Sequence, residues 1–352
     1  MSRRYEVLDD RAVDRILDRA WELLARVGVW IEDPAHLDWM EREGLRVDRG
    51  AGRVFFERGT AGKLVESAPS SFALYGRDDQ EGMRIGDGVC RFNPGSAAVH
   101  WLEPGTANHR LATAADCCTL ATLTEALDAF ALQATGVVPA DAPAALGDCL
   151  RLYWALACCR KPVVTGTFRR ESFAVMEQML RVVSDRPMAV FDCCPSPPLK
   201  WTGLTLAALF DCARGGIPAE LVSMPLAGAT APVTLEGAVV QQTAENLSGV
   251  VLHQLAGPGA PIVWGGSPAA FDMRYGTTPM GAMETMLIDL GAARVGKRLG
   301  LPTHAYMACS DAKLPDYQAG MESGIGAVLA VAGGVGIVSG PGFLNYENTQ
   351  SP

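Results

Sequence analysis

From about residue 95 onward, short apolar runs alternate regularly with segments of helical pattern. Strands that are apolar throughout are buried on both faces, which is typical of a parallel sheet covered by helices. Seven such strand–helix units predict an α/β fold, a TIM-type (β/α)8 barrel rather than an open doubly wound sheet. The expected strands are residues 130–138, 162–168, 188–193, 219–225, 261–265, 303–309 and 336–339. The eighth strand that a barrel requires is not evident from the sequence.

The first part of the chain has a different pattern. We expect residues 1–94 to form an N-terminal α+β region, followed by the barrel over residues 95–352. The acidic residues at positions 9 and 10 can cap a first helix. Asp33 followed by Pro34 has the residue types that favour the cap and first turn of a second helix.

Charge and hydropathy exclude several classes of protein. The net charge of −9 argues against a nucleic-acid or anionic-membrane partner, which clustered Lys and Arg would bind. No apolar stretch is long enough to span a bilayer, and the first residues lack the apolar segment of a signal peptide. We therefore expect a cytoplasmic protein. Its ten cysteines include no CxxC pair, so a structural zinc site is not expected and reduced thiols are.

The ends of the predicted strands hold the candidate site. In a parallel α/β fold, ligands bind at the carboxyl ends of the strands. Polar groups are densest at residues 302–318, where one buried strand ends. Because side chains alternate along a strand, His304 and Tyr306 should face the same side, and we expect that side to be the barrel interior. The candidate substrate-binding residues are His304, Tyr306, Trp264, Asp311, Lys313, Gln318 and Ser267.

Each of these residues also has a purely structural interpretation. His304 and Trp264 can fill the core, Asp311 can cap the next helix, and Lys313 can be solvated. Acidic pairs are scarce at the strand ends, where Asp192 and Asp311 are the plausible carboxylates. The sequence thus predicts neither the facing carboxylates of a glycosidase nor, without a GxSxG motif, a serine hydrolase.

The string THAYMACSDAKLPDYQAGMES, followed by GGVGIVSGPG, resembles the trimethylamine methyltransferase family of corrinoid-dependent methyltransferases. NPGSAAVHW at 93–101 and GAMETMLIDLGAARVGKRLGLP at 281–302 support the resemblance, which runs over nearly the whole chain. It implies a barrel that passes a methyl group from a methylated amine to a cobalt corrinoid on a separate carrier protein. Ala312 and Lys313 are ordinary residues, so the chain resembles the branch without pyrrolysine, which acts on quaternary amines such as glycine betaine. Family members continue beyond residue 352, so we expect that a C-terminal family segment is missing.

The chemistry of such a reaction suits a strand rim with few acids and bases. Demethylation of a quaternary ammonium is an in-line displacement whose leaving group, a tertiary amine, is neutral and needs no proton. The site must hold a cation, and aromatic faces do so. Trp264 and Tyr306 are the expected aromatic pair, joined by Phe343 or Tyr346 from the last loop. A carboxylate on the substrate could be held by His304, Lys313 or Arg274.

We expect no bound metal, and the expected partners are a corrinoid protein, a small methylated amine and, in a homo-oligomer, further copies of the chain. Two alternatives remain open. One is a zinc-dependent barrel methyltransferase with Cys193 or Cys194, His304 and Cys309 as ligands. The other is a catalytically silent relative that binds a small cation or the carrier protein.

Overall fold

Eight parallel strands close into a barrel in the computed structural model, which describes residues 5–352. One ladder joins five strands in the order β9, β10, β11, β13 and β15, and a second joins β17, β18 and β6. Bridges between Trp264 and Thr303 and between Phe92 and Phe130 close the ring. The strands are β6 (Arg91–Asn93), β9 (Gln133–Ala134), β10 (Val163–Thr165), β11 (Ala189–Cys193), β13 (Ala219–Ser223), β15 (Ile262–Gly266), β17 (His304–Tyr306) and β18 (Ile337–Ser339). The barrel and its seven expected strands are confirmed.

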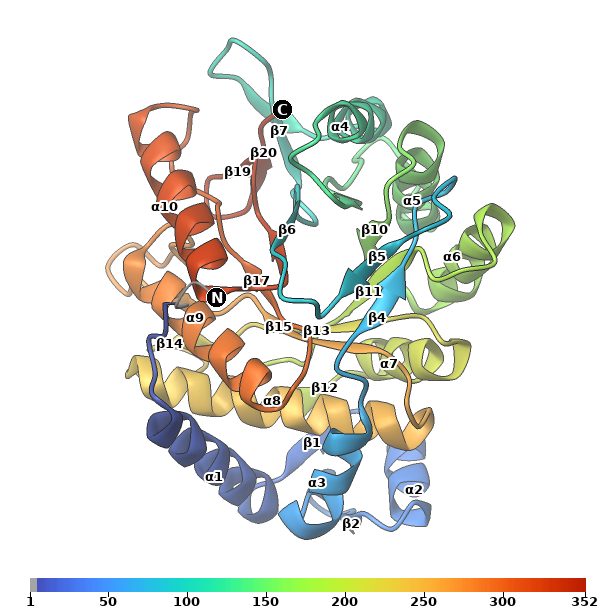
Figure 1. The fold of residues 1–352 in the computed structure, drawn as a ribbon, viewed down its shortest axis with the longest axis vertical. Helices are drawn as coiled ribbons and strands as arrows, with labels where there is room; N and C mark the ends of the chain where they lie inside the picture. The colour runs from blue at the N-terminus through green and yellow to red at the C-terminus, as the bar shows by residue number, and fades with distance from the viewer. Residues whose placement is uncertain (1–4) are drawn as a thin grey trace.

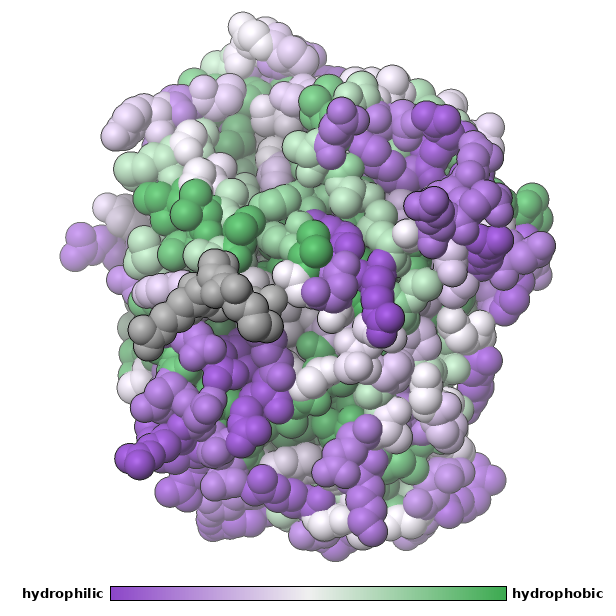
Figure 2. Space-filling view, viewed as in Figure 1, coloured by the Kyte–Doolittle hydropathy of each residue, from purple (hydrophilic) through white to green (hydrophobic). Residues whose placement is uncertain are grey.

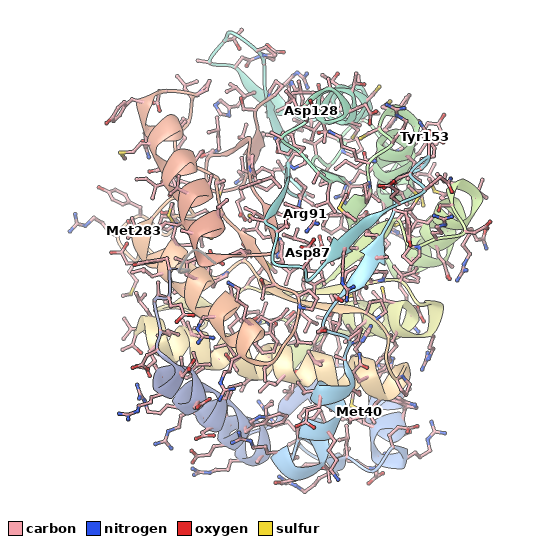
Figure 3. All side chains as sticks on the ribbon, in the orientation of Figure 1. Met40, Asp87, Arg91, Asp128, Tyr153 and Met283 are labelled. Atoms are coloured by element: carbon pink, nitrogen blue, oxygen red, sulfur yellow. The ribbon has the colours of Figure 1, made fainter. Side chains whose placement is uncertain are left out.

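The strand that the sequence did not reveal is β6, which pairs in parallel with β18. It begins at Arg91, inside the range that we expected to belong to the N-terminal region. Its start is held by an ion pair in which Arg91 Nη2 lies 2.7 Å from Asp87 Oδ2 (Figure 3). The hydrogen bonds from Arg91 lower the pKa of Asp87 to about 2, so this pair stays charged at neutral pH.

A helix follows each of the first seven strands of the barrel. These helices are α4 (Ala114–Ala126), α5 (Gly147–Cys158), α6 (Arg170–Val183), α7 (Gly203–Gly215), α8 (Leu235–Ala256), α9 (Met283–Arg298) and α10 (Tyr317–Gly333). After β18 the described chain instead forms a hairpin of β19 (Phe343–Leu344) and β20 (Thr349–Gln350). Two further pairs of short strands lie in the loops. β7 (His100–Leu102) pairs antiparallel with β8 (His109–Leu111), and β14 (Leu226–Ala227) pairs in parallel with β16 (Ala269–Ala270).

The outer face of α10 is apolar and exposed. Ile325, Val328 and Val331 recur at helical spacing and keep 38%, 68% and 54% of their surface exposed. Figure 2 shows apolar residues gathered over this helix. Beside it, residues of α4, α10 and the last loop line a groove of about 410 Å³. In the described residues no helix lies between α10 and α4, where a complete barrel would carry its eighth.

The N-terminal region packs on the outside of the barrel, against α8 (Figure 1). It consists of α1 (Asp10–Arg26), β1 (Val29–Ile31), α2 (Pro34–Arg42), β2 (Arg46–Asp48), β3 (Arg53–Phe55) and α3 (Arg58–Ser67). The expected caps form, since Asp9 accepts a hydrogen bond from Ala12 N and Asp33 accepts one from Ala35 N. The loop after β11 contributes β12 (Lys200–Trp201) to the small sheet, in the order β12-β1-β3-β2. Barrel and N-terminal region therefore share one apolar core.

The amino-terminal end of the barrel is closed by a hairpin of β4 (Phe72–Leu74) and β5 (Met83–Ile85). Leu74 and Ile85 are fully buried and pack against Val164, Val190 and Val263 of the barrel strands. An apolar plug at this end leaves the carboxyl ends of the strands for a binding site. Among the described residues, no helix has the length and apolar content needed to cross a bilayer.

Candidate active site

A cavity of about 220 Å³ lies at the carboxyl ends of the barrel strands. It is lined by residues that follow or end β6, β10, β11, β13, β15 and β17, by one residue of α5 and by one of the β19–β20 loop. Its polar and ionisable lining residues are Ser96, Arg151, Asp192, Ser267, Tyr306 and Glu347, together with Cys194 and Thr167. The cavity therefore lies at the carboxyl ends of the strands, where we expected a candidate site.

His304 and Tyr306 both point into the barrel, in agreement with the alternation along β17. Tyr306 lines the cavity and donates a hydrogen bond from its hydroxyl to Ser96 O at 2.8 Å. Its ring stacks on Phe343, with centroids 6.4 Å apart. His304 lies deeper and does not line the cavity. Its Nε2 is 2.9 Å from Ser339 Oγ, and its Nδ1 is 3.1 Å from Glu220 Oε1 on β13, beyond the intervening strand β15. We expected His304 to bind substrate, and the structure instead makes it part of the layer beneath the site.

Two carboxyl groups line the cavity and a third lies beneath it, in contrast to the acid-poor rim that we expected. Asp192 and Glu220 are register partners on β11 and β13, and Glu347 comes from the β19–β20 loop. Burial raises the pKa of Asp192 to about 7 and that of Glu347 to about 8. Burial, and then the neighbouring Asp192, raises the pKa of Glu220 well above its usual range. These acids hold protons near neutral pH and would ionise if a cation entered.

Glu347 reaches the cavity through an unusual backbone. Asn345, Tyr346 and Glu347 all have positive φ values, of 53°, 59° and 61°. Such left-handed conformations cost non-glycine residues about 1–2 kcal/mol each and cluster at functional sites. The turn is held by a hydrogen bond from Asn345 N to Ala312 O at 2.9 Å. Ser267 Oγ lies 3.5 Å from Glu347 Oε2, so the predicted site residue Ser267 does belong to the cavity wall.

Arg151, on α5, brings a buried positive charge to the same cavity. The residue is only 2% exposed. Its Nη2 donates to Thr135 O at 2.6 Å and to Thr135 Oγ1 at 3.0 Å. The ring of Phe168 lies over the guanidinium, with its centroid 5.0 Å from Cζ. The cavity thus has a cation on one wall and titratable carboxyl groups on others.

Trp264 does not line the cavity. Its indole is 1% exposed and donates from Nε1 to Ala292 O of α9 at 3.0 Å, in the layer between strands and helices. The neighbouring Gly265 faces inward, because a Cβ there would meet His304 Nδ1 at 2.8 Å. Alternation along β15 then directs Trp264 outward. Of the expected aromatic pair, Tyr306 lines the cavity and Trp264 does not.

Asp311, Lys313 and Gln318 also lie outside the cavity lining. Asp311 accepts hydrogen bonds from Met280 N at 2.8 Å and Gly281 N at 2.9 Å, and so holds the loop before α9. Lys313 is exposed, and its Nζ lies 3.8 Å from the ring centroid of Tyr346. Gln318 is exposed on α10 and donates to a glutamate on the next turn. Their density in the sequence reflects loop and helix-cap structure.

The residues of the zinc alternative do not converge. Cys194 lines the cavity, whereas Cys193 lies beside Cys212 of α7 and Cys309 lies in an apolar cluster. Within residues 5–352, no three His, Cys, Asp or Glu side chains are placed to hold a metal ion.

The sequence reasoning missed Arg151 and Glu347, which line the cavity, and Glu220, which lies beneath it beside His304. The sequence did contain a signal for Glu220, because burying a carboxyl group inside the apolar strand AELVS costs free energy unless the group is paired or hydrogen-bonded. Arg151 is likewise the one basic residue in the helix GDCLRLYWALAC. Glu347 had no comparable signal, since it lies in a polar loop at the end of the chain.

Comparison with known proteins gives one consistent result. The family described as trimethylamine methyltransferase (MTTB) matches residues 1–345. The trimethylamine methyltransferase MttB of Desulfitobacterium hafniense (strain DSM 10664 / DCB-2) is 28% identical over 93% of this chain and 68% of its own length. The glycine betaine methyltransferase of Desulfitobacterium hafniense (strain Y51) is 29% identical over 99% of this chain and 74% of its own.

Solved structures support the fold. The monomethylamine methyltransferase MtmB of Methanosarcina barkeri superposes with a TM-score of 0.68 at 11% identity, over 99% of this chain and 72% of its own. A hydroxylamine complex of MtmB gives 0.69 at 10% identity. The likeness at this identity concerns the barrel fold alone, while the family match covers nearly the whole sequence. This chain is therefore a methyltransferase and belongs to the trimethylamine methyltransferase family.

Proposed function

We propose that the protein transfers a methyl group from a quaternary or tertiary amine to the cobalt of a corrinoid carried by a separate protein. The observation that carries the proposal is the cavity at the barrel mouth of a chain of this family. It is small, and Asp192, Glu347 and the face of Tyr306 line it. These are groups that favour a compact organic cation.

The dimensions of the cavity fit an amine and a corrinoid held elsewhere. At about 220 Å³ it is smaller than the sites of drug-sized ligands, which span about 300–1,000 Å³. A corrinoid macrocycle must therefore meet the substrate from outside. Phe168 and Met224 line the cavity with 59% and 40% of their surface exposed, and they would contact a corrinoid presented at the mouth. When bound there, the corrinoid would supply the cobalt nucleophile that accepts the methyl group.

The residues of this chain bind and orient the amine. Ionised Asp192 and Glu347 would neutralise the ammonium, and the ring of Tyr306 would contact its methyl groups. A quaternary amine leaves as a neutral tertiary amine and needs no proton. A tertiary amine leaves as a neutral product only if it is protonated, and Asp192, with a pKa of about 7, can hold that proton near the nitrogen.

The test is methyl transfer to free cob(I)alamin, with trimethylamine and glycine betaine as separate substrates. The loss of the cobalt(I) absorbance measures the transfer. We expect transfer from at least one of them. We also expect Asp192→Asn to reduce it by about tenfold or more, since one charge partner of the cation is lost. Asp185→Asn, at an exposed position, is the matched control. Folded wild-type protein that demethylates neither amine, with free cob(I)alamin or with corrinoid proteins of related systems, would contradict the proposal.

A further inference from the structure

Two cysteines on neighbouring helices of the barrel lie in direct contact, and the proposed reaction uses neither of them. Cys118 lies on α4 and Cys158 ends α5, and these two helices pack side by side (Figure 1). Their Sγ atoms are 2.9 Å apart. We propose that this pair is an oxidation site, which closes to an intramolecular disulfide bond when it meets the disulfide of a small thiol such as glutathione. The inference does not depend on the proposed function, since neither cysteine lines the cavity.

The first support is the placement of the two sulfur atoms. A disulfide bond is about 2.05 Å long, so the 2.9 Å between the Sγ atoms has to shorten by about 0.9 Å. The sequence neighbours Cys117 and Cys159 are buried instead. Each of the doubled cysteines, at 117–118 and at 158–159, therefore directs one thiol into the core and the other toward the neighbouring helix.

The second support is a set of polar contacts that hold the two helix ends together beside the cysteines. Glu125 of α4 accepts hydrogen bonds from Arg160 N at 2.8 Å and from Arg160 Nε at 2.7 Å. Lys161 Nζ donates to Thr124 O of α4 at 2.6 Å. These contacts come directly after the second cysteine and fix the end of α5 against the end of α4. Thiols held in this way react as an intramolecular pair, which favours the internal bond over a lasting mixed disulfide.

The third support is access for the oxidant. Cys118 and Cys158 are both partly exposed, so a small molecule can reach them. Cys193 and Cys212 also lie beside each other, but both are fully buried in the main core. Oxidation of the folded protein should therefore select the pair between α4 and α5.

The reaction consists of two exchange steps with glutathione disulfide. Burial and the neighbouring thiol raise the pKa of Cys158 to about 11, so Cys158 keeps its proton and we assign the first attack to Cys118. The Cys118 thiolate bonds to one sulfur of the oxidant, the S–S bond of the oxidant breaks, and one glutathione leaves and takes up the proton. Cys158 then loses its proton and attacks Cys118 Sγ, which releases the second glutathione. Two cysteine thiols are oxidised, and one glutathione disulfide is reduced to two thiols.

The test is oxidation of the folded wild-type protein with glutathione disulfide, followed by an acid quench and thiol counting in denaturant. The count should fall by two from the ten cysteines of the sequence, and dithiothreitol should restore it. A non-reducing tryptic map should join residues 111–151, which carry Cys118, to residues 152–160, which carry Cys158. The bond links positions 40 residues apart, and the loop it closes should raise the thermal unfolding midpoint by about 2–5 °C.

Single substitutions then assign the bond to the pair. Cys158→Ala should stop at the mixed disulfide and gain one glutathione by mass, whereas Cys118→Ala should form no internal bond. Cys149→Ala, at another partly exposed cysteine of α5, is the matched control and should oxidise as the wild type does. Wild-type protein that keeps ten free thiols, or that carries lasting glutathione adducts in place of the internal bond, would overturn the proposal. An internal bond that survives in Cys118→Ala would overturn it as well.

Discussion

Above neutral pH, the ligand-free Glu347→Gln variant should have a higher unfolding free energy than the wild type. The side chain of Glu347 reaches the barrel mouth from a left-handed turn, and its Oε1 is shut off from solvent without a hydrogen-bond partner. Burial raises its pKa from an ordinary 4.5 to about 8. Glutamine has nearly the same shape and stays neutral, so the substitution removes the titration with little change in packing.

The direction of the effect follows from proton linkage. Between pH 4.5 and about 8 the folded protein keeps a proton on Glu347 that the unfolded chain has lost. The contribution of Glu347 to stability is therefore fully present below pH 4.5 and is lost as pH rises to about 8. At about 1.4 kcal/mol per pH unit, the loss has an upper limit of about 5 kcal/mol. Local opening of the β19–β20 loop lets the carboxylate ionise at lower cost, so we expect about 2–4 kcal/mol.

Urea unfolding at several pH values from about 5 to 9 measures this difference. The unfolding free energy of the wild type should fall across this range by about 2–4 kcal/mol more than that of Glu347→Gln. Glu66→Gln, at an exposed position on α3, should follow the wild type. Parallel pH curves for the wild type and Glu347→Gln would show that the carboxyl group is solvated in the folded protein, and would remove it from the cation site.

Three further substitutions test the layers of the barrel. Trp264→Phe should lower the unfolding free energy by about 1–3 kcal/mol, because it removes the hydrogen bond to Ala292 and leaves a gap where the indole was. It should not change the amine affinity measured by calorimetric titration. A matching loss of affinity would show that Trp264 contacts the substrate. His304→Ala should lower the unfolding free energy measured in urea by about 2–4 kcal/mol, because it leaves a cavity and removes the hydrogen bond between His304 and Ser339. An unchanged unfolding free energy would contradict this deep placement. Asp192→Asn should weaken binding of a quaternary amine about tenfold above pH 7 and little below pH 6, because the pKa of Asp192 is about 7. A loss of affinity that is independent of pH would show that the negative charge of Asp192 does not bind the amine.

The fold followed from hydropathy where the strands were apolar, and was missed where one was not. Every predicted strand is a run that the barrel buries on both faces, so burial and sequence agree. β6 reads Arg-Phe-Asn over three residues, and its arginine and asparagine are polar. Arg91 is neutralised by Asp87, and the side-chain amide of Asn93 donates to Ser339 at 2.8 Å. A strand of three residues, two of them polar, has no apolar period to detect.

The sequence predicted which way some side chains of the candidate site point, but not which residues line the cavity. Alternation correctly predicted that His304 and Tyr306 share the barrel interior, because it depends on local geometry alone. It could not say how deep each lies, which depends on strand tilt and on contacts such as the one between His304 and Glu220 of β13. The direction of Trp264 depended on its neighbour Gly265, whose missing side chain makes room for His304. Glu347 reaches the cavity through a turn that folds the last loop back over the barrel mouth, and this position depends on tertiary structure that the local sequence does not reveal.

The acids and the single arginine of this cavity are best understood as one electrostatic arrangement. In the free protein Asp192 keeps its proton below about pH 7 and Glu347 below about pH 8, so below these values the cavity avoids the cost of buried, unpaired carboxylates. An entering ammonium would lower both pKa values and release protons, which makes binding stronger as pH rises. Arg151 has its counter-charge in Asp148, whose Oδ1 lies 3.7 Å from Nη1. The affinity of the cavity for an ammonium should therefore depend on pH through Asp192 and Glu347.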